Sequence, residues 1–168
     1  QAVFRPDLRI LIMSATLDEE ALSRALGGVP IVKSAGRSFP VEISYASDDL
    51  NPERDSVPAV AAAIRRALRT TEGDILVFLP GTSEITRVGA SLQDLLGAGL
   101  DVRPLHGELT IEAQQAAIVP GPKRRVVLAT NIAETSLTIE GVRVVIDSGL
   151  ARVSRFDSGL GLSRLDTV

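Results

Sequence analysis

The sequence predicts an α/β fold with a mainly parallel sheet and helices on both of its faces. Short runs rich in β-branched residues recur along the chain, and several are apolar on both sides, as buried parallel strands are. Between them lie stretches with helical spacing, each of which begins at a plausible N-cap residue or proline. Strands that alternate with helices at this pitch require right-handed crossover connections, which place helices on both faces of the sheet.

The predicted strands are the runs in which Val, Ile and Leu cluster. They cover residues 8–13, 31–32, 41–45, 75–79, 102–105, 126–129 and 142–146. After the strand at 41–45, residues 48–53 form a polar, turn-rich stretch without helical period. The segment 34–53 is therefore interpreted as a linker between two α/β units.

The predicted helices follow the same reading of spacing and caps. They cover residues 19–26, 58–68, 83–96 and 111–118, and the last three are expected to be capped by Ser56, Thr82 and Thr110. At the end of the chain, residues 162–168 alternate apolar and polar side chains, which indicates a half-buried strand.

Composition limits the classes of protein to consider. The 168 residues include 18 Lys and Arg, 21 Asp and Glu and no cysteine, which excludes a disulfide-stapled secreted domain. No apolar run approaches the roughly 20 residues that cross a bilayer, so no membrane partner is expected. Of the 18 basic residues, 16 are Arg. Arginine suits bidentate phosphate contacts, but a GC-rich genome accounts for this bias without any function and is the favoured explanation. Since only 3% of the residues are aromatic, any nucleic acid should be held mainly by its backbone rather than by base stacking.

The start of the chain predicts its context. It opens on Gln1 rather than an initiator Met and lacks a basic, then apolar, then small-residue signal pattern. We therefore expect an excised fragment of a longer protein with a cytoplasmic location.

Several kinds of chemistry lack support in the sequence. No complete phosphate-binding or dinucleotide fingerprint is present, and the single histidine, His106, is more typical of a turn than of a catalytic base. No spacing of carboxylates and histidines suggests a metal site. A Rossmann-like small-molecule enzyme is therefore the weakest interpretation.

Three predicted strand ends carry polar residues that core packing does not require, at residues 14–16, 80–82 and 130–138. Small hydroxyls, an amide and exposed backbone N–H groups at the carboxyl ends of strands suit phosphate oxygens. A structural interpretation competes at each place. Thr16 with Glu19 and Asn131 with Glu134 have the spacing of capping boxes, and Gly81 followed by Thr82 is an ordinary helix start.

Taken together, a set of motifs in order resembles the DEAH-box ATP-dependent RNA helicases of superfamily 2. The motifs are IMSATLD at 12–18, GRSFPV at 36–41, ILVFLPG at 75–81, LHG at 105–107, ATNIAETSLTI at 129–139 and VIDSG at 145–149. The LHG motif and GLAR at 149–152 look most like the bacterial HrpB-type subgroup. The resemblance covers nearly the whole chain.

The resemblance implies two tandem RecA-like, P-loop NTPase-like domains, three-layer folds with ATP in the cleft between them and single-stranded RNA across their top. Residues 1–36 would be the end of the first domain. Residues 37–168 would be most of the second, truncated before motif VI. Residues 151–167, with a tight turn at 157–159, look like the family's β-hairpin that wedges into RNA.

The resemblance also implies roles for individual residues. Ser14 and Thr16 would couple hydrolysis to domain movement, and Ser136 and Glu140 would face the nucleotide, Glu140 standing where the family usually has Asp. The RNA backbone would be held by Pro80, Gly81, Thr82, Thr130, Asn131 and Thr135. At 116–119, where many relatives place a Phe against the adenine ring, there is no aromatic residue.

The implied activity is translocation on and unwinding of RNA, driven by ATP with Mg²⁺, with the rest of the helicase chain as a partner and DNA left open as a substrate. The Walker A loop and the Asp-Glu-Ala-His box are missing, so the fragment alone is expected to be inactive. The alternative is a non-enzymatic α/β interaction module that kept the fold and lost the motor. A Gly-Lys-Thr loop upstream of Gln1 would favour the motor, and its absence would favour the module.

Overall fold

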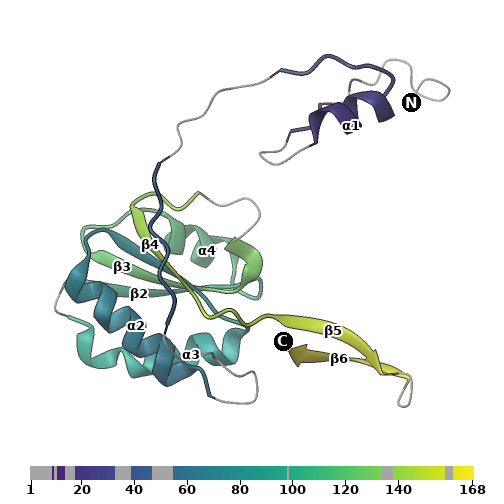
Figure 1. The fold of residues 1–168 in the computed structure, drawn as a ribbon. Helices are drawn as coiled ribbons and strands as arrows, with labels where there is room; N and C mark the ends of the chain where they lie inside the picture. Colours follow the sequence, from purple (N-terminus) through teal and green to yellow (C-terminus); the bar gives the residue numbers. More distant parts are fainter. Residues whose placement is uncertain are drawn as a thin grey trace. The chain divides into compact units, whose positions relative to one another are not determined.

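A computed structural model describes residues 9, 11–13, 18–32, 39–46, 55–97, 99–133, 138–157 and 161–168. The chain divides into two compact units, Gln1–Tyr45 and Ala46–Val168. The described part of the first unit contains one helix, α1 (Glu19–Ala25), and the second holds all the other elements (Figure 1). The assignment of residues 1–36 and 37–168 to two different RecA-like domains stays a prediction.

Two sequence predictions for the first unit are wrong. The Asp18 carboxylate accepts a hydrogen bond from the Ala21 amide at 3.0 Å and caps α1, so the N-cap is not Thr16. The described residues of the runs 8–13, 31–32 and 41–45 form no strand. Alternation of side chains shows which residues share a face, but a strand also needs a hydrogen-bonded neighbour.

The sheet of the second unit confirms the predicted α/β class. It contains β1 (Asp74–Phe78), β2 (Leu100–Leu105), β3 (Arg124–Ala129) and β4 (Val142–Asp147). All pairings are parallel, and the strand order is β2-β3-β1-β4 (Figure 1). Each strand overlaps in sequence with a run that was predicted to be a buried strand.

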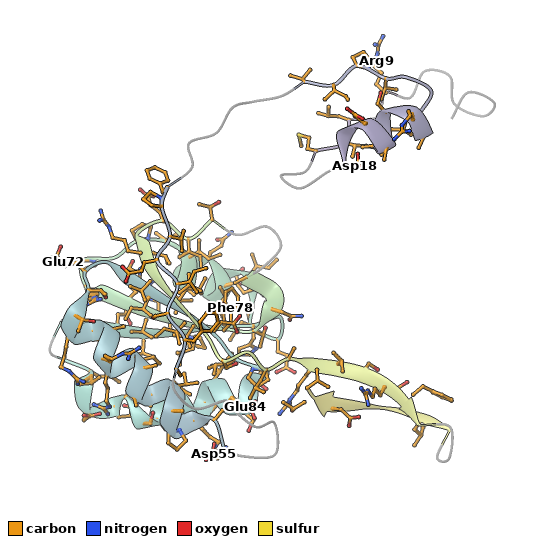
Figure 2. All side chains as sticks on the ribbon, in the orientation of Figure 1. Arg9, Asp18, Asp55, Glu72, Phe78 and Glu84 are labelled. Atoms are coloured by element: carbon orange, nitrogen blue, oxygen red, sulfur yellow. The ribbon has the colours of Figure 1, made fainter. Side chains whose placement is uncertain are left out.

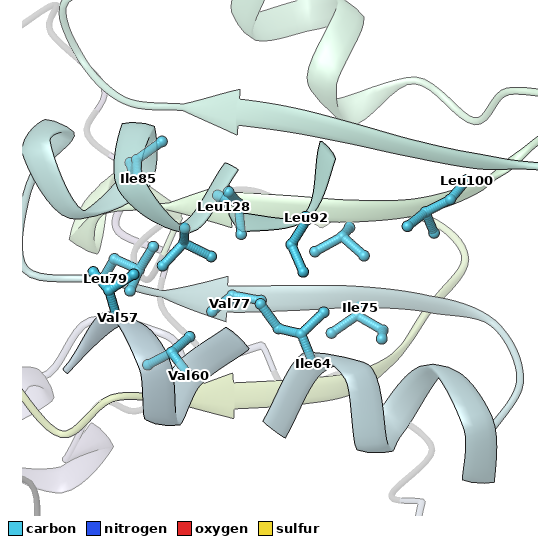
Figure 3. Packing of buried hydrophobic residues seen from close by; sticks show 12 residues of the cluster. Val57, Val60, Ile64, Ile75, Val77, Leu79, Ile85, Leu92, Leu100 and Leu128 are labelled. Atoms are coloured by element: carbon cyan, nitrogen blue, oxygen red, sulfur yellow. The ribbon is translucent and has the colours of Figure 1, made fainter. Parts of the chain in front are cut away.

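Helices cover both faces of this sheet, as predicted. Helices α2 (Val57–Thr70) and α3 (Thr82–Ser91) pack over one face, where Ile75 and Val77 of β1 join their buried side chains in one cluster (Figure 3). Helix α4 (Ile111–Ile118) packs on the other face, where Leu76 belongs to a second cluster. Successive strand residues point to opposite faces, so one apolar run supplies both halves of the core.

The helix starts agree with the predicted caps only in part. Thr110 caps α4 as predicted, because its hydroxyl accepts from the Ala113 amide at 3.3 Å. Ser56 is the N-cap residue of α2 but makes no side-chain cap bond. Instead the Asp55 carboxylate accepts from the Val57 amide at 3.1 Å, which lowers the pKa of Asp55. The N-cap residue of α3 is Gly81, so the prediction of Thr82 as its cap is wrong by one position.

The predicted helix at 83–96 is interrupted, and an arginine from α2 binds the segment where it breaks. Helix α3 stops at Ser91 and a 3-10 turn, η1 (Gln93–Leu95), follows. The Arg65 guanidinium donates to the Ser91 carbonyl at 2.7 Å and to both carboxylate oxygens of Asp94 at 2.8 and 2.6 Å. The hydrogen bond from Arg65 lowers the pKa of Asp94.

Two consecutive arginines at the start of β3 hold the ends of helices on opposite faces of the sheet. Arg124 donates to the carbonyl oxygens of Gly73 at 2.6 Å and Leu68 at 2.9 Å, near the end of α2. Arg125, the only fully buried charged side chain of the described residues, lies on the α4 side and pairs with Asp74 at 2.6 Å. Neither residue stands out in the sequence pattern.

A two-stranded antiparallel sheet ends the chain and confirms the predicted hairpin. Strand β5 (Arg152–Asp157) pairs with β6 (Leu162–Thr167), and Ala151 and Val168 extend the ladder with two 2.9 Å bonds (Figure 1). Residues 158 and 159 of the expected turn lie outside the described residues. Over the described ranges, no helix is both long and apolar enough to cross a membrane.

Candidate nucleic-acid interface

A concave site lies at the carboxyl ends of the four parallel strands. Its volume is about 300 Å³, and segments that follow β1, β2, β3 and β4 all contribute to its wall. Its lining includes Phe78, Pro80, Gly81, Thr82, His106, Glu108, Thr130, Asn131, Asp147 and Arg152. This is the position at which parallel α/β sheets usually bind ligands, because the loops there are free to carry polar groups.

One wall of the cavity is the turn from β1 into α3. Pro80 and Gly81 are buried and Thr82 is half-buried. The Leu79 amide donates to the Ala129 carbonyl at 2.8 Å, which fixes this turn against the end of β3. Since Gly81 has no side chain to cap α3, the first backbone N–H groups of the helix keep their donor capacity for a ligand.

The opposite wall follows β3. The Thr130 amide donates to the Leu105 carbonyl at 3.2 Å, and its own carbonyl accepts from Ala133 at 3.3 Å. Asn131 is exposed and begins a 3-10 turn, η2 (Asn131–Ala133). The structure therefore brings Pro80, Gly81, Thr82, Thr130 and Asn131 together in one cavity. Their predicted companions Ser14, Thr16, Thr135 and Ser136 lie outside the described residues.

His106 also lines the cavity, although its sequence context is more typical of a turn residue. It follows β2 directly, and its Nδ1 atom is buried without a hydrogen-bond acceptor or donor among the described residues. Glu108 carries the nearby carboxylate, 3.9 Å from Nδ1. The position of LHG directly after a predicted strand is the signal that could have found it.

Arg152, the first residue of β5, brings a fixed positive charge to the cavity. Its guanidinium lies 3.4 Å from both carboxylate oxygens of Glu84 on α3, which Figure 2 labels. A Cβ atom on Gly81 would lie 2.8 Å from the Arg152 Cζ, so glycine leaves the room that the guanidinium occupies. Asp147 adds a carboxylate, one oxygen of which accepts from the Gly149 amide at 2.8 Å.

Glu140 lies at the other end of the sheet. It directly precedes Gly141 and β4, at the amino ends of the strands, and its side chain is exposed. Its carbonyl oxygen accepts a hydrogen bond from Arg125 at 2.5 Å. The residue predicted to face the nucleotide is thus separated from the residues predicted to hold RNA, and its nucleotide contact stays a prediction.

The fold and this site define a RecA-like α/β domain with a polar ligand site at the carboxyl edge of its sheet. Residues 59–158 match the model of the helicase conserved C-terminal domain. The chain therefore belongs to the helicase conserved C-terminal domain family.

The relatives of this chain are helicases. It is 49% identical to the ATP-dependent RNA helicase HrpB of Escherichia coli, over 99% of this chain and 21% of that protein. It is 40% identical to the ATP-dependent RNA helicase HrpA of the same organism, over 96% of this chain and 13% of that one. The crystal structure of the Escherichia coli DEAH/RHA helicase HrpB superposes with a TM-score of 0.85, covering 100% of this chain and 22% of that one. The chain thus spans about a fifth or less of these relatives.

Proposed function

We propose that this chain is part of an ATP-dependent RNA helicase, and that the cavity at the carboxyl ends of its strands holds the RNA sugar-phosphate backbone. The observation that carries the proposal is the meeting of two separate motifs, residues 80–82 and 130–131, in one cavity. The names of the relatives support RNA as the substrate.

The chemistry of the cavity suits a backbone better than a base. Thr82 and Thr130 offer hydroxyl groups, Asn131 an amide and Arg152 a guanidinium, all of which can donate to phosphate oxygens. Phe78 is the one aromatic ring other than the imidazole in the cavity lining, so a stack of successive bases finds little support there. Contacts of this kind position a strand without reading its sequence.

We place the nucleotide at the other end of the sheet. The exposed carboxylate of Glu140 is free to accept hydrogen bonds, as a nucleotide contact requires, and residues 116–119 at the end of α4 would complete this wall. Ser136 stays a predicted nucleotide contact. Among the described residues, no three acidic or histidine side chains are grouped so that they could hold a metal ion. A Mg²⁺ ion would therefore depend on ligands from ATP and from the rest of the protein. When bound, ATP would supply the free energy for movement along RNA through its hydrolysis.

The proposed division of the chain explains how the two ends cooperate. Residues 1–36, with Ser14 and Thr16, would belong to the first RecA-like domain and residues 37–168 to the second. Closure of two such domains around a nucleotide is a hinge motion, and it would move the backbone-holding cavity relative to the first domain. The hairpin β5–β6 would stand against the strand being separated. A cytoplasmic location stays a prediction.

A non-enzymatic interaction module with the same fold is the second candidate. It keeps the sheet, the helices and the cavity but requires no nucleotide. The two functions differ in one observable, which is ATP hydrolysis that depends on RNA in the full-length protein.

We expect the 168-residue chain alone to hydrolyse no ATP, since it lacks the loop that wraps the phosphates, whereas the full-length protein hydrolyses ATP and is stimulated by single-stranded RNA. Phosphate release by both proteins, with and without RNA, is the measurement. Turnover by a clean preparation of the chain that Ser136→Ala abolishes would contradict the first expectation. A full-length protein with RNA binding but without ATP hydrolysis would favour the interaction module.

A further inference from the structure

One buried side chain joins two segments that are far apart in the sequence. Arg125 has no exposed side-chain surface, and its Nη2 donates to the Glu140 carbonyl at 2.5 Å. Its Nη1 donates to three carbonyl oxygens at the end of α4, those of Ala117 (3.2 Å), Ile118 (2.8 Å) and Val119 (2.9 Å). A single guanidinium therefore connects the end of α4 with the turn that precedes β4.

Asp74 holds that guanidinium in place. Its two carboxylate oxygens accept from the Arg125 backbone amide at 2.7 Å, from Nε at 2.8 Å and from Nη2 at 2.6 Å. The Asp74 amide in turn donates to the Gly141 carbonyl at 2.9 Å. Gly141 has a φ of +91°, and a Cβ there would lie 2.8 Å from Asp74 Oδ2. The turn at 140–141 is thus held by both members of the pair, and glycine alone leaves room for it.

We infer that Arg125, fixed by Asp74, is a positioning residue that keeps the end of α4 and the turn at 138–141 in one arrangement, so that together they form the nucleotide-facing surface. This inference rests on the proposed function, in which Glu140 and residues 116–119 face ATP. The guanidinium binds only the backbone of these segments, and it leaves the Glu140 carboxylate and the exposed Val119 side chain directed away from the core.

The neighbouring Arg124 is a useful comparison, because its hydrogen bonds stabilise the end of a single helix. Arg124 also makes three hydrogen bonds, to the carbonyls of Gly73 and Leu68 and to the Thr71 hydroxyl, but all three acceptors lie at or just after the end of α2. Arg103 reaches the end of α4 through the Val119 carbonyl at 3.3 Å, with no hydrogen bond to the turn at 140–141 among the described residues. Arg125 alone of these three joins both segments.

The test compares Arg125→Lys with Arg124→Lys in the full-length helicase. An ammonium group has three donors on one atom and cannot span the carboxylate, the helix end and the turn as a planar guanidinium does. We expect Arg125→Lys to raise the KM for ATP on the order of tenfold, because the two segments lose their fixed spacing. The kcat at saturating ATP and the affinity for RNA should stay within about twofold of wild type. Arg124→Lys should lower the melting temperature similarly and leave the KM for ATP unchanged.

A second pair of variants covers the case in which Arg125→Lys does not fold. Gly141→Ala strains the turn and keeps the arginine at 125, although its Cβ would lie 2.8 Å from Asp74 Oδ2 and 3.5 Å from Arg125 Nη2. Its control, Gly99→Ala, has a similar φ of +85° with open space around it. Gly141→Ala should raise the KM for ATP as Arg125→Lys does, and Gly99→Ala should not. Equal shifts in a variant and its control, or an unchanged KM in both Arg125→Lys and Gly141→Ala of an active enzyme, would overturn this inference alone. A wild-type protein without ATP hydrolysis would overturn the proposed function as well.

Discussion

Asp74→Ala should lower the free energy of unfolding of the chain by about 3–5 kcal/mol, the largest effect that we expect of a single substitution outside the cavity. Arg125 is fully buried, and the carboxylate of Asp74 is its only acidic partner among the described residues. Removing the carboxylate leaves an uncompensated charge in the core. The carbonyls of Arg125's other partners cannot neutralise it, because they carry no net charge.

Chemical denaturation of the chain, followed by circular dichroism, measures this effect. The matched control is Asp101→Ala, which removes a carboxylate from a half-exposed pair with Arg103 at 2.7 Å. Exposed and half-exposed pairs contribute about 0.2–1 kcal/mol, so the control should change little. If both variants lose the same free energy of unfolding, the buried pair stabilises the fold no more than the half-exposed pair does.

Replacing Thr130 and Asn131 together with Ala in the full-length protein should weaken binding of single-stranded RNA by about tenfold or more. Each hydrogen bond to a charged phosphate contributes about 1.5–3 kcal/mol, and the double change removes two side-chain donors from the cavity. The loss should be about equal for all RNA sequences, because backbone contacts do not read bases. Stimulation of ATP hydrolysis by RNA should fall with it. Fluorescence anisotropy with several RNA sequences measures the affinities.

The competing interpretation makes Asn131 a helix cap. Asn131 begins the short turn η2, and loss of a cap typically costs about 1 kcal/mol of stability. A lower melting temperature with unchanged RNA affinity and unchanged stimulation would therefore support the cap and contradict the RNA contact. Since Asn131 lies in the cavity together with residues 80–82, we expect the RNA contact.

The second unit was predictable because its signals are local. Helix α4 begins and ends where its spacing and the Thr110 cap predict, and strands β1 to β4 coincide with apolar runs. Parallel strands buried on both faces leave such runs whatever their neighbours are. The position of the site was predictable for the same reason, since the strand ends mark the edge where a ligand binds.

What the sequence did not reveal depends on residues that are distant along the chain. The residue that binds the early end of α3 is Arg65, which comes from α2. Burial of Arg125 requires Asp74, 51 residues earlier, and nothing in the local pattern distinguishes it from a solvent-exposed arginine beside a strand. His106 and Arg152 were not predicted as site residues. They are 46 residues apart in the sequence, and only the fold brings both of them to the same cavity.

The proposed function depends most on whether the cavity between residues 80–82 and 130–131 holds the RNA backbone. A structure of the full-length protein with a bound single-stranded RNA oligonucleotide tests it directly. We predict phosphate or ribose oxygens within hydrogen-bond distance, about 3 Å, of donors on both segments, with the bases turned away from them. RNA bound elsewhere on the protein while this cavity holds only solvent would contradict the proposed role of the cavity.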